Sequence, residues 1–289
     1  LLAEDGVTPE FQPRPLRWPG VIMSGALIAL TTWFGVQNLQ KAQARGLVQA
    51  GQIDAARGIV QSLLSSSNSD SEAHALGLQT ASSREEAKRE AQLATVYGPS
   101  VKNWRTYARL LGSLKEDEAA QSALVKALQV DPNNLPALRF RLDLYRDQNA
   151  TELALATAQR LVEVENSSAF KIRAIPESVP IETYDARLYL AGYEKDREKK
   201  YQQLVAAASG YAAFAKTTIP KILEGAQFDP NFRFAGDGLQ EANQALDKGE
   251  TALREARAID DAQKRNNESL DAVEAAFVAA RGAVLGLKK

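Results

Sequence analysis

Apolar residues recur every three or four positions over most of the chain, and turn-forming residues interrupt this pattern at short intervals. In the segment "KALQVDPNNLPALR" (residues 126–139), the helical spacing stops at Asp131 and resumes at Leu135. Proline cannot continue a backbone hydrogen-bond ladder and asparagine readily takes turn conformations, so "DPNN" predicts the end of one helix and the start of another. Because alanine is abundant and β-branched runs are short, the pattern predicts an all-α chain.

The same arrangement recurs along the chain at a spacing of roughly 31 to 34 residues. In residues 103–134, large and small apolar residues occupy fixed positions on two predicted helices: Trp104, Ala108, Leu111, Ala120, Leu124, Ala127 and Pro132. The following segment fills these positions with Leu138, Leu142, Tyr145, Ala154, Ala158 and Leu161. The preceding segments fill them with Ala75, Leu78, Ala87, Ala91, Ala94 and Pro99, and with Ala44, Leu47, Gly51, Ala56, Val60 and Leu63.

These positions resemble the tetratricopeptide repeat, a helix–turn–helix unit of about 34 residues. The resemblance implies an α-solenoid of about four repeats over residues 41–168, in which each hairpin buries its apolar face on the next. It also implies a groove, formed mainly by the first helices, that binds a protein or peptide. The candidate groove residues are Trp104, Arg105, Tyr107, Arg139, Arg141 and Tyr145.

An apolar stretch precedes the first repeat. No charged residue occurs in residues 18–40, and aromatic residues lie near both ends of this segment. About twenty apolar residues in a helix cross the hydrocarbon core of a bilayer, and aromatic rings favour the lipid–water boundary. We therefore expect a transmembrane helix over residues 18–40, preceded by an extended arm at residues 1–17. A signal peptide and a buried core helix are the alternatives, but no small-residue cleavage site follows the stretch.

The C-terminal third departs from the repeat phase. Prolines make residues 169–183 a predicted connector, and residues 184–232 contain further helices that include a possible degenerate repeat within 199–230. Residues 233–289 predict a helical hairpin that caps the solenoid. Five tyrosines in this third of the chain either pack in the core or line a recognition surface: Tyr184, Tyr189, Tyr193, Tyr201 and Tyr211.

Composition narrows the chemistry. Lys and Arg number 35 against 36 Asp and Glu, so no basic surface for nucleic acid is expected. The chain has no cysteine, which excludes disulfides and cysteine nucleophiles and suits an oxidising bacterial compartment. Its one histidine, His74, is expected to be a packed residue of a repeat helix. We find no catalytic constellation, and we expect no metal and no cofactor.

Together these features favour a non-enzymatic, membrane-tethered scaffold that mediates protein–protein interaction in the assembly of an envelope complex. We expect it in a bacterial cell membrane, with a single span and with the repeat domain outside the cytoplasm. The alternative is a fragment of a larger protein, because the chain also resembles the C-terminal repeat tail of a polytopic O-antigen ligase or polysaccharide polymerase. A third interpretation is a single-span accessory to protein export or quality control.

Overall fold

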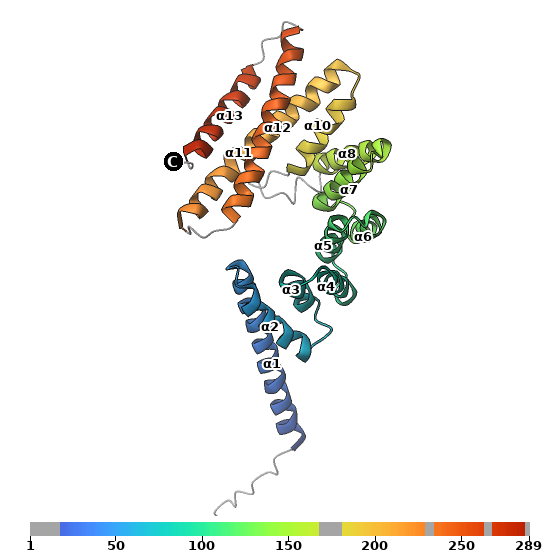
Figure 1. The fold of residues 1–289 in the computed structure, drawn as a ribbon, viewed down its shortest axis with the longest axis vertical. Coiled ribbons are helices and arrows are strands. Elements are labelled where there is room, and N and C mark those ends of the chain that lie inside the picture. The colour runs from blue at the N-terminus through green and yellow to red at the C-terminus, as the bar shows by residue number, and fades with distance from the viewer. Residues whose placement is uncertain (1–17, 168–180, 229–233, 263–267, 287–289) are drawn as a thin grey trace, which may run out of the picture. The chain divides into compact units, whose positions relative to one another are not determined.

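The computed structural model describes residues 18–167, 181–228, 234–262 and 268–286 of the chain (Figure 1). Within these ranges the structure consists of helices and short turns and contains no strand, so the all-α prediction is confirmed for them. The chain forms two compact units, one up to Pro99 and one from Ser100 onward.

The first unit contains two helical hairpins. Its helices are α1 (Trp18–Gln49), α2 (Ile53–Ser66), α3 (Ser71–Thr80) and α4 (Arg84–Tyr97). Ala44 of α1, Val60 of α2 and Leu76 of α3 form a buried cluster that joins the first hairpin to the second. Gly51 has a φ of 74° in the turn between α1 and α2, a left-handed conformation that glycine adopts without a steric penalty.

The buried face of α3 differs from the predicted one. The repeat pattern placed Ala75 and Leu78 at packing positions, and this is wrong, because both are partly exposed while Ala73 and Leu76 are buried. The side chain of Asp70 accepts hydrogen bonds from the backbone N–H groups of Glu72 and Ala73, at 2.9 and 3.1 Å, and so caps the helix at its start. Each residue turns the helix by about 100°, so a shift of one or two positions selects a different face.

His74 is a packed residue, as predicted. Its ring is buried, and Nε2 lies 2.9 Å from the backbone oxygen of Asn68. A carbonyl oxygen can only accept a hydrogen bond, so Nε2 is the donor. Nδ1 lies 2.6 Å from Oε2 of Glu90 on α4, and the ring stacks on Tyr97 with centroids 5.4 Å apart. The histidine therefore ties the two helices of the second hairpin together.

Residues 18–40, which we expect to span a membrane, lie in the first part of α1. Where the structure describes side chains, it contains no helix that combines the length and the apolar character needed to cross a bilayer. The side chains of residues 18–31 and the whole arm at residues 1–17 lie outside the described residues. The membrane span therefore stays a prediction.

The second unit continues with hairpins and ends in longer helices. Its helices are α5 (Val101–Ser113), α6 (Asp117–Val130), α7 (Leu135–Asp147), α8 (Thr151–Asn166), α10 (Ile181–Tyr193), α11 (Arg197–Phe228), α12 (Phe234–Ala262) and α13 (Glu268–Gly286). In Figure 1, α5 with α6 and α7 with α8 form neighbouring hairpins, and α10 packs on α8 and α11. α11, α12 and α13 pack on one another and form the C-terminal bundle.

The hairpin of α5 and α6 is built on the predicted small residues. Ala108, Ala120 and Ala127 are completely buried. Leu111 and Leu124 fill the space between them, with 1% and 0% of their surface exposed. Methyl side chains at these positions let the two helices approach closely, and the leucines fill the remaining volume. The prediction for this hairpin is confirmed at the level of individual residues.

The turn "DPNN" joins α6 to α7 as its composition predicts. Asn134 accepts a hydrogen bond from the backbone N–H of Ala137 at 3.1 Å and caps α7, and Pro136 lies in the first turn of this helix, where its missing N–H costs nothing. Leu128 of α6 packs against the core of its own hairpin and against that of α7 and α8. The chain ends one helix and begins another here because each hairpin buries its apolar face on its neighbour.

The possible repeat within residues 199–230 is wrong. Residues 197–228 form one continuous helix, so the hairpin in this part of the chain consists of α10 and α11. Pro220 lies inside α11, where it removes one backbone hydrogen bond. The proline is exposed, while the adjacent Ile219 is buried in the core of the C-terminal bundle. Packing of this face holds the helix together through the proline.

Two glycines allow the helices of this part to approach closely. A methyl group on Gly210 of α11 would overlap the ring of Tyr184 on α10, and one on Gly249 of α12 would overlap Phe277 of α13. By contrast, a methyl group on Gly192 of α10 would meet no atom within 4 Å.

We expect Gly249→Ala to lower the free energy of unfolding by about 1–3 kcal/mol, because the packed ring of Phe277 has to move. The matched control Gly192→Ala should raise it by up to about 1 kcal/mol, since alanine loses less backbone entropy in a helix. Urea denaturation followed by circular dichroism measures both. Equal stability of the two variants would contradict the close packing of α12 on α13.

Candidate protein-interaction face

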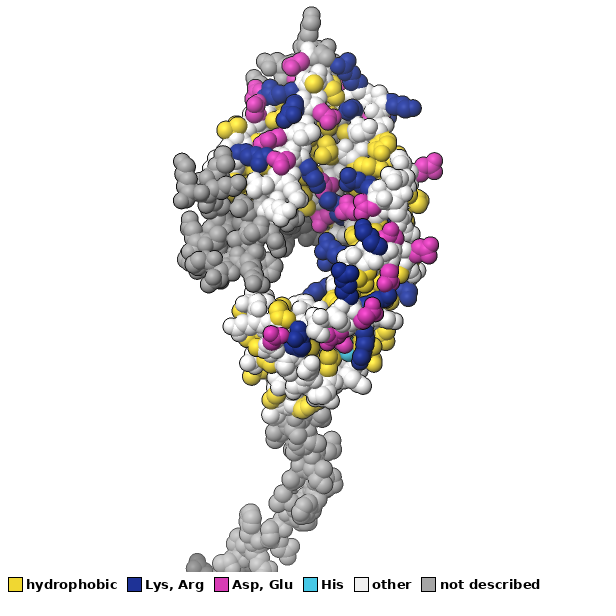
Figure 2. Space-filling model, in the orientation of Figure 1, with side chains coloured by type: hydrophobic (Ala, Val, Ile, Leu, Met, Phe, Trp, Pro, Cys, Tyr) yellow, Lys and Arg dark blue, Asp and Glu magenta, His cyan; other side chains and the backbone are white. Residues whose placement is uncertain are grey.

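Three first helices of the second unit lie side by side, because α5 contacts α7 and α7 contacts α10. Their shared face carries charged side chains, which we call the α5–α7–α10 face: Arg105, Arg109, Arg139, Asp143, Arg146, Glu182 and Asp185. Cations outnumber carboxylates in this set. In the space-filling view, Lys and Arg side chains gather over α5 and α7 (Figure 2).

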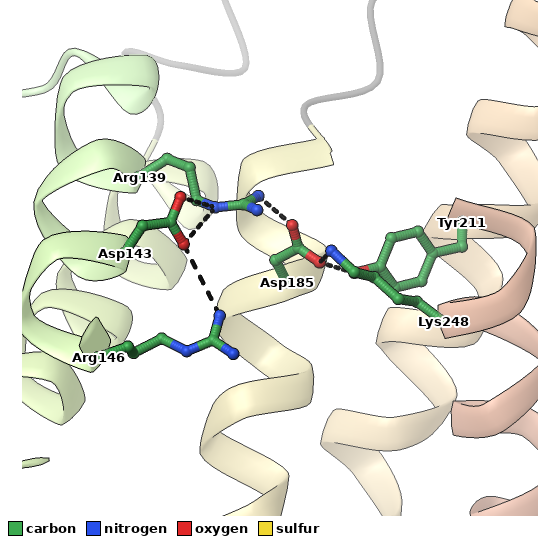
Figure 3. Close-up of polar contacts among 6 residues, drawn as sticks. All are labelled: Arg139, Asp143, Arg146, Asp185, Tyr211 and Lys248. Atoms are coloured by element: carbon green, nitrogen blue, oxygen red, sulfur yellow. Dashed lines mark hydrogen bonds and ion pairs between the residues drawn. The ribbon is translucent and has the colours of Figure 1, made fainter. Parts of the chain in front are cut away.

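Asp185 of α10 is the buried centre of this face. Only 6% of its surface is exposed, and its carboxylate forms an ion pair with the guanidinium of Arg139 on α7. The hydroxyl of Tyr211 on α11 donates a hydrogen bond to Oδ1, and Nζ of Lys248 on α12 lies 2.8 Å from the same oxygen (Figure 3). Because a buried charge is costly unless it is paired and hydrogen-bonded, these partners are what permits the burial.

Arg139 is held from both sides. Its Nε lies 3.1 and 3.2 Å from the two carboxylate oxygens of Asp143, one helical turn further along α7. Burial alone would lower the pKa of Arg139, but the carboxylates of Asp185 and Asp143 raise it above its ordinary value. Arg146 also approaches Asp143, at 3.7 Å. The side chain therefore has a fixed position on the face.

Tyr211 supplies a neutral donor. Burial raises the pKa of its phenol well above the ordinary value, and the negative charge of Asp185 acts in the same direction. The hydroxyl therefore stays protonated at neutral pH and donates to the carboxylate. Tyr184 packs edge-on against Tyr211 with ring centroids 5.9 Å apart, and burial raises its pKa to about 12.

Arg105 and Arg109 of α5 lie in a different electrostatic environment. Like Arg139 and Asp143, they lie four positions apart on one helix, but here both side chains are cationic. Burial and the neighbouring charge of Arg109 lower the pKa of Arg105, while Glu182 of α10 acts in the opposite sense. Neither guanidinium group forms an ion pair or a hydrogen bond with a side chain of a described residue.

The remaining candidate groove residues lie on another side of the first helices. Trp104 and Tyr107 pack against the core between α5 and α6, and Nζ of Lys126 on α6 lies 4.7 Å from the Trp104 ring centroid. Tyr145 is buried in the core between α7 and α8, and Arg141 donates a hydrogen bond from Nε to its hydroxyl at 3.0 Å. The six candidates therefore divide into Arg105 and Arg139 on the α5–α7–α10 face and four residues whose contacts lie within their own hairpins.

The tyrosines of the C-terminal third also divide. Tyr201 and Tyr211 are buried in the core of the C-terminal bundle, and Tyr184 packs against it. Tyr189 and Tyr193 lie nearer the surface with ring centroids 5.1 Å apart, and the guanidinium of Arg146 lies 5.1 Å from the Tyr189 ring.

Several members of the face were not among the candidates. Arg109 and Asp143 were within reach of the sequence, because residues four apart share a helix face and each follows a candidate arginine by four positions. Asp185 and Lys248 carry no such signal, since their contacts depend on how α10 and α12 pack. Among the described residues, no group of three or more His, Cys, Asp or Glu is arranged to hold a metal ion.

No protein-family model matches the sequence, and no curated protein matches it. Among solved structures, a tetratricopeptide repeat protein from Parabacteroides merdae is similar with a TM-score of 0.46 and 14% identity, over 84% of this chain and 98% of that one. PilF of Pseudomonas aeruginosa is similar with a TM-score of 0.45 and 17% identity, over 77% and 96% of the two chains. PilW, a type IV pilus biogenesis factor, has a TM-score of 0.44 and 18% identity, over 82% and 98%. At this distance the similarities assign neither a family nor a partner.

Proposed function

We propose that the chain is a non-enzymatic scaffold that binds a protein partner through the α5–α7–α10 face and is tethered to a membrane by residues 18–40. The observation that carries the proposal is the fixed, cation-rich surface of this face, on which ion pairs with the buried Asp185 and the more exposed Asp143 hold Arg139 in place. A surface whose side chains are already ordered loses little conformational entropy when a partner binds. Such preorganisation favours recognition of a protein surface or an extended peptide.

The construction of the second unit supports this function. Each first helix contributes one strip of the face, so the face extends over α5, α7 and α10. The C-terminal bundle also contributes, because Lys248 of α12 contacts Asp185 at the centre of the face. Among the described residues, a partner that lies along the face would therefore contact helices.

The proposed tether rests on the apolar character of residues 18–40. The described part of this segment has exposed apolar side chains: Trp33 is 44% exposed, Phe34 57% and Leu39 70%. Large apolar side chains that a fold leaves in water are typical of surfaces that contact lipid or another protein. Attachment to a membrane would raise the effective concentration of the scaffold beside membrane partners.

This arrangement suits the assembly of an envelope complex. We place the chain in a bacterial cell membrane with the repeat units on the extracytoplasmic side. The resemblance to the tail of an O-antigen ligase stays a prediction.

Site-specific photo-crosslinking in the cells that make the protein tests the scaffold. A photoreactive residue at Lys102, which lies one turn before Arg105 on α5, should give a discrete adduct with one protein. The matched control is Val125, an exposed position on α6, a second helix, where the same residue should give no adduct. Equal adducts from both positions, or none from Lys102, would contradict a partner on the α5–α7–α10 face.

Flotation with phospholipid vesicles tests the tether. The full chain should float with the vesicles and resist extraction at alkaline pH. The variant Leu27→Arg with Leu30→Arg should remain at the bottom of the gradient, because each arginine at the bilayer centre costs about 2.5–3.5 kcal/mol on insertion scales. A full chain that stays at the bottom, or a variant that floats equally well, would overturn the tether and leave the scaffold untouched.

A further inference from the structure

α5 and α7 each carry an arginine on the α5–α7–α10 face, but the residue four positions later has opposite charge on the two helices. On α7, Arg139 is followed four residues later by Asp143, and the two side chains form an ion pair at 3.1 Å. On α5, Arg105 is followed four residues later by Arg109. Residues at this spacing face each other on a helix surface, where opposite charges stabilise the helix and like charges destabilise it.

The repulsion on α5 is not relieved by other described residues. Arg105 is partly buried, and both burial and Arg109 disfavour its charge. Glu182 acts favourably on Arg105 without forming an ion pair with it. Arg139, by contrast, has a second carboxylate in Asp185 of α10. α5 thus holds two interacting guanidinium groups, and neither is paired with a carboxylate of a described residue.

We propose that Arg105 and Arg109 form a binding site for a carboxylate side chain of an acidic segment in the partner protein. The inference rests on the proposed function, because it specifies the chemistry of the partner that the α5–α7–α10 face binds. The partner's carboxylate would take the place next to Arg105 that Asp143 occupies next to Arg139. The planar guanidinium groups match the two oxygens of a carboxylate and bind them with charge-assisted hydrogen bonds.

The surroundings favour an acidic protein segment over nucleic acid. Asp143 and Glu182 lie on the same face and would repel a continuous phosphate backbone. A protein segment can place one or two carboxylates at the arginines and other residues beside the carboxylates of the face. The site therefore selects for local charge and not for a uniformly negative ligand.

The test is selection from a phage library of random dodecapeptides against the full chain at physiological salt. Peptides enriched in Asp and Glu should be selected. The double variant Arg105→Gln with Arg109→Gln should bind one synthetic peptide from the selection at least about tenfold more weakly, because the charge-assisted contacts are lost.

The charge-reversed variant Arg105→Glu with Arg109→Glu should select peptides enriched in Lys and Arg. The control Arg254→Glu, at an exposed position of α12, should leave the acidic preference unchanged.

A further variant separates binding from folding. Arg109→Asp recreates on α5 the pair that Arg139 and Asp143 form on α7, so it should raise Tm while it weakens binding of the same synthetic peptide. A variant that loses both Tm and affinity would indicate a structural role and overturn the proposal.

The outcomes distinguish failure of the carboxylate site from failure of the proposed scaffold function. Selected peptides without acidic enrichment, or peptides whose binding ignores both arginines, overturn the carboxylate site and leave the scaffold function intact. A selection that yields no binding peptide contradicts peptide recognition by the scaffold and the carboxylate site with it. Tight binding of a single-stranded DNA dodecamer that both arginine variants abolish, with no acidic peptide selected, would assign the site to nucleic acid.

Discussion

The carboxylate of Asp185 is the interaction on which the second unit depends most. It receives Arg139 from α7, Tyr211 from α11 and Lys248 from α12, so one buried charge joins the repeat hairpins to the C-terminal bundle (Figure 3). Burying a carboxylate without such partners would cost several kcal/mol. The pairing therefore fixes how the helices pack, since a helix that moves away leaves a charge without compensation.

The same network orders part of the α5–α7–α10 face. Arg139 is used by the fold, because its guanidinium is occupied by Asp143 and Asp185. The guanidinium groups of Arg105 and Arg109 form no ion pair with a described residue, and their mutual repulsion lowers the stability of the helix. Locally unfavourable features are expected at functional sites, which is why we propose that a partner carboxylate binds here. In the proposed account, the face combines a part ordered by the fold, at Arg139, with a partner-binding part at Arg105 and Arg109.

Much of the fold follows from local sequence. The "DPNN" turn and the small residues Ala108, Ala120 and Ala127 predict the hairpin of α5 and α6, because turn chemistry and close helix approach depend on residue type. The buried face of α3 was missed because it depends on how the helix packs on its neighbours, which buries Ala73 and Leu76. The continuity of α11 through Pro220 was missed because packing of Ile219 outweighs the lost hydrogen bond. For the candidate site, helical spacing in the sequence indicates the arginines on α5 and α7. The contact between Asp185 and Lys248 could not be predicted, because it depends on tertiary packing.

The most direct test of this account is the free energy of unfolding of Asp185→Ala, measured by urea denaturation of the full chain. The account predicts a loss of about 3 kcal/mol or more, because Arg139 and Tyr211 would keep buried polar groups without their partner. Asp143→Ala, whose carboxylate is more exposed, serves as the control and should cost about 1 kcal/mol or less. A loss below about 1 kcal/mol for Asp185→Ala would contradict the central role of this carboxylate.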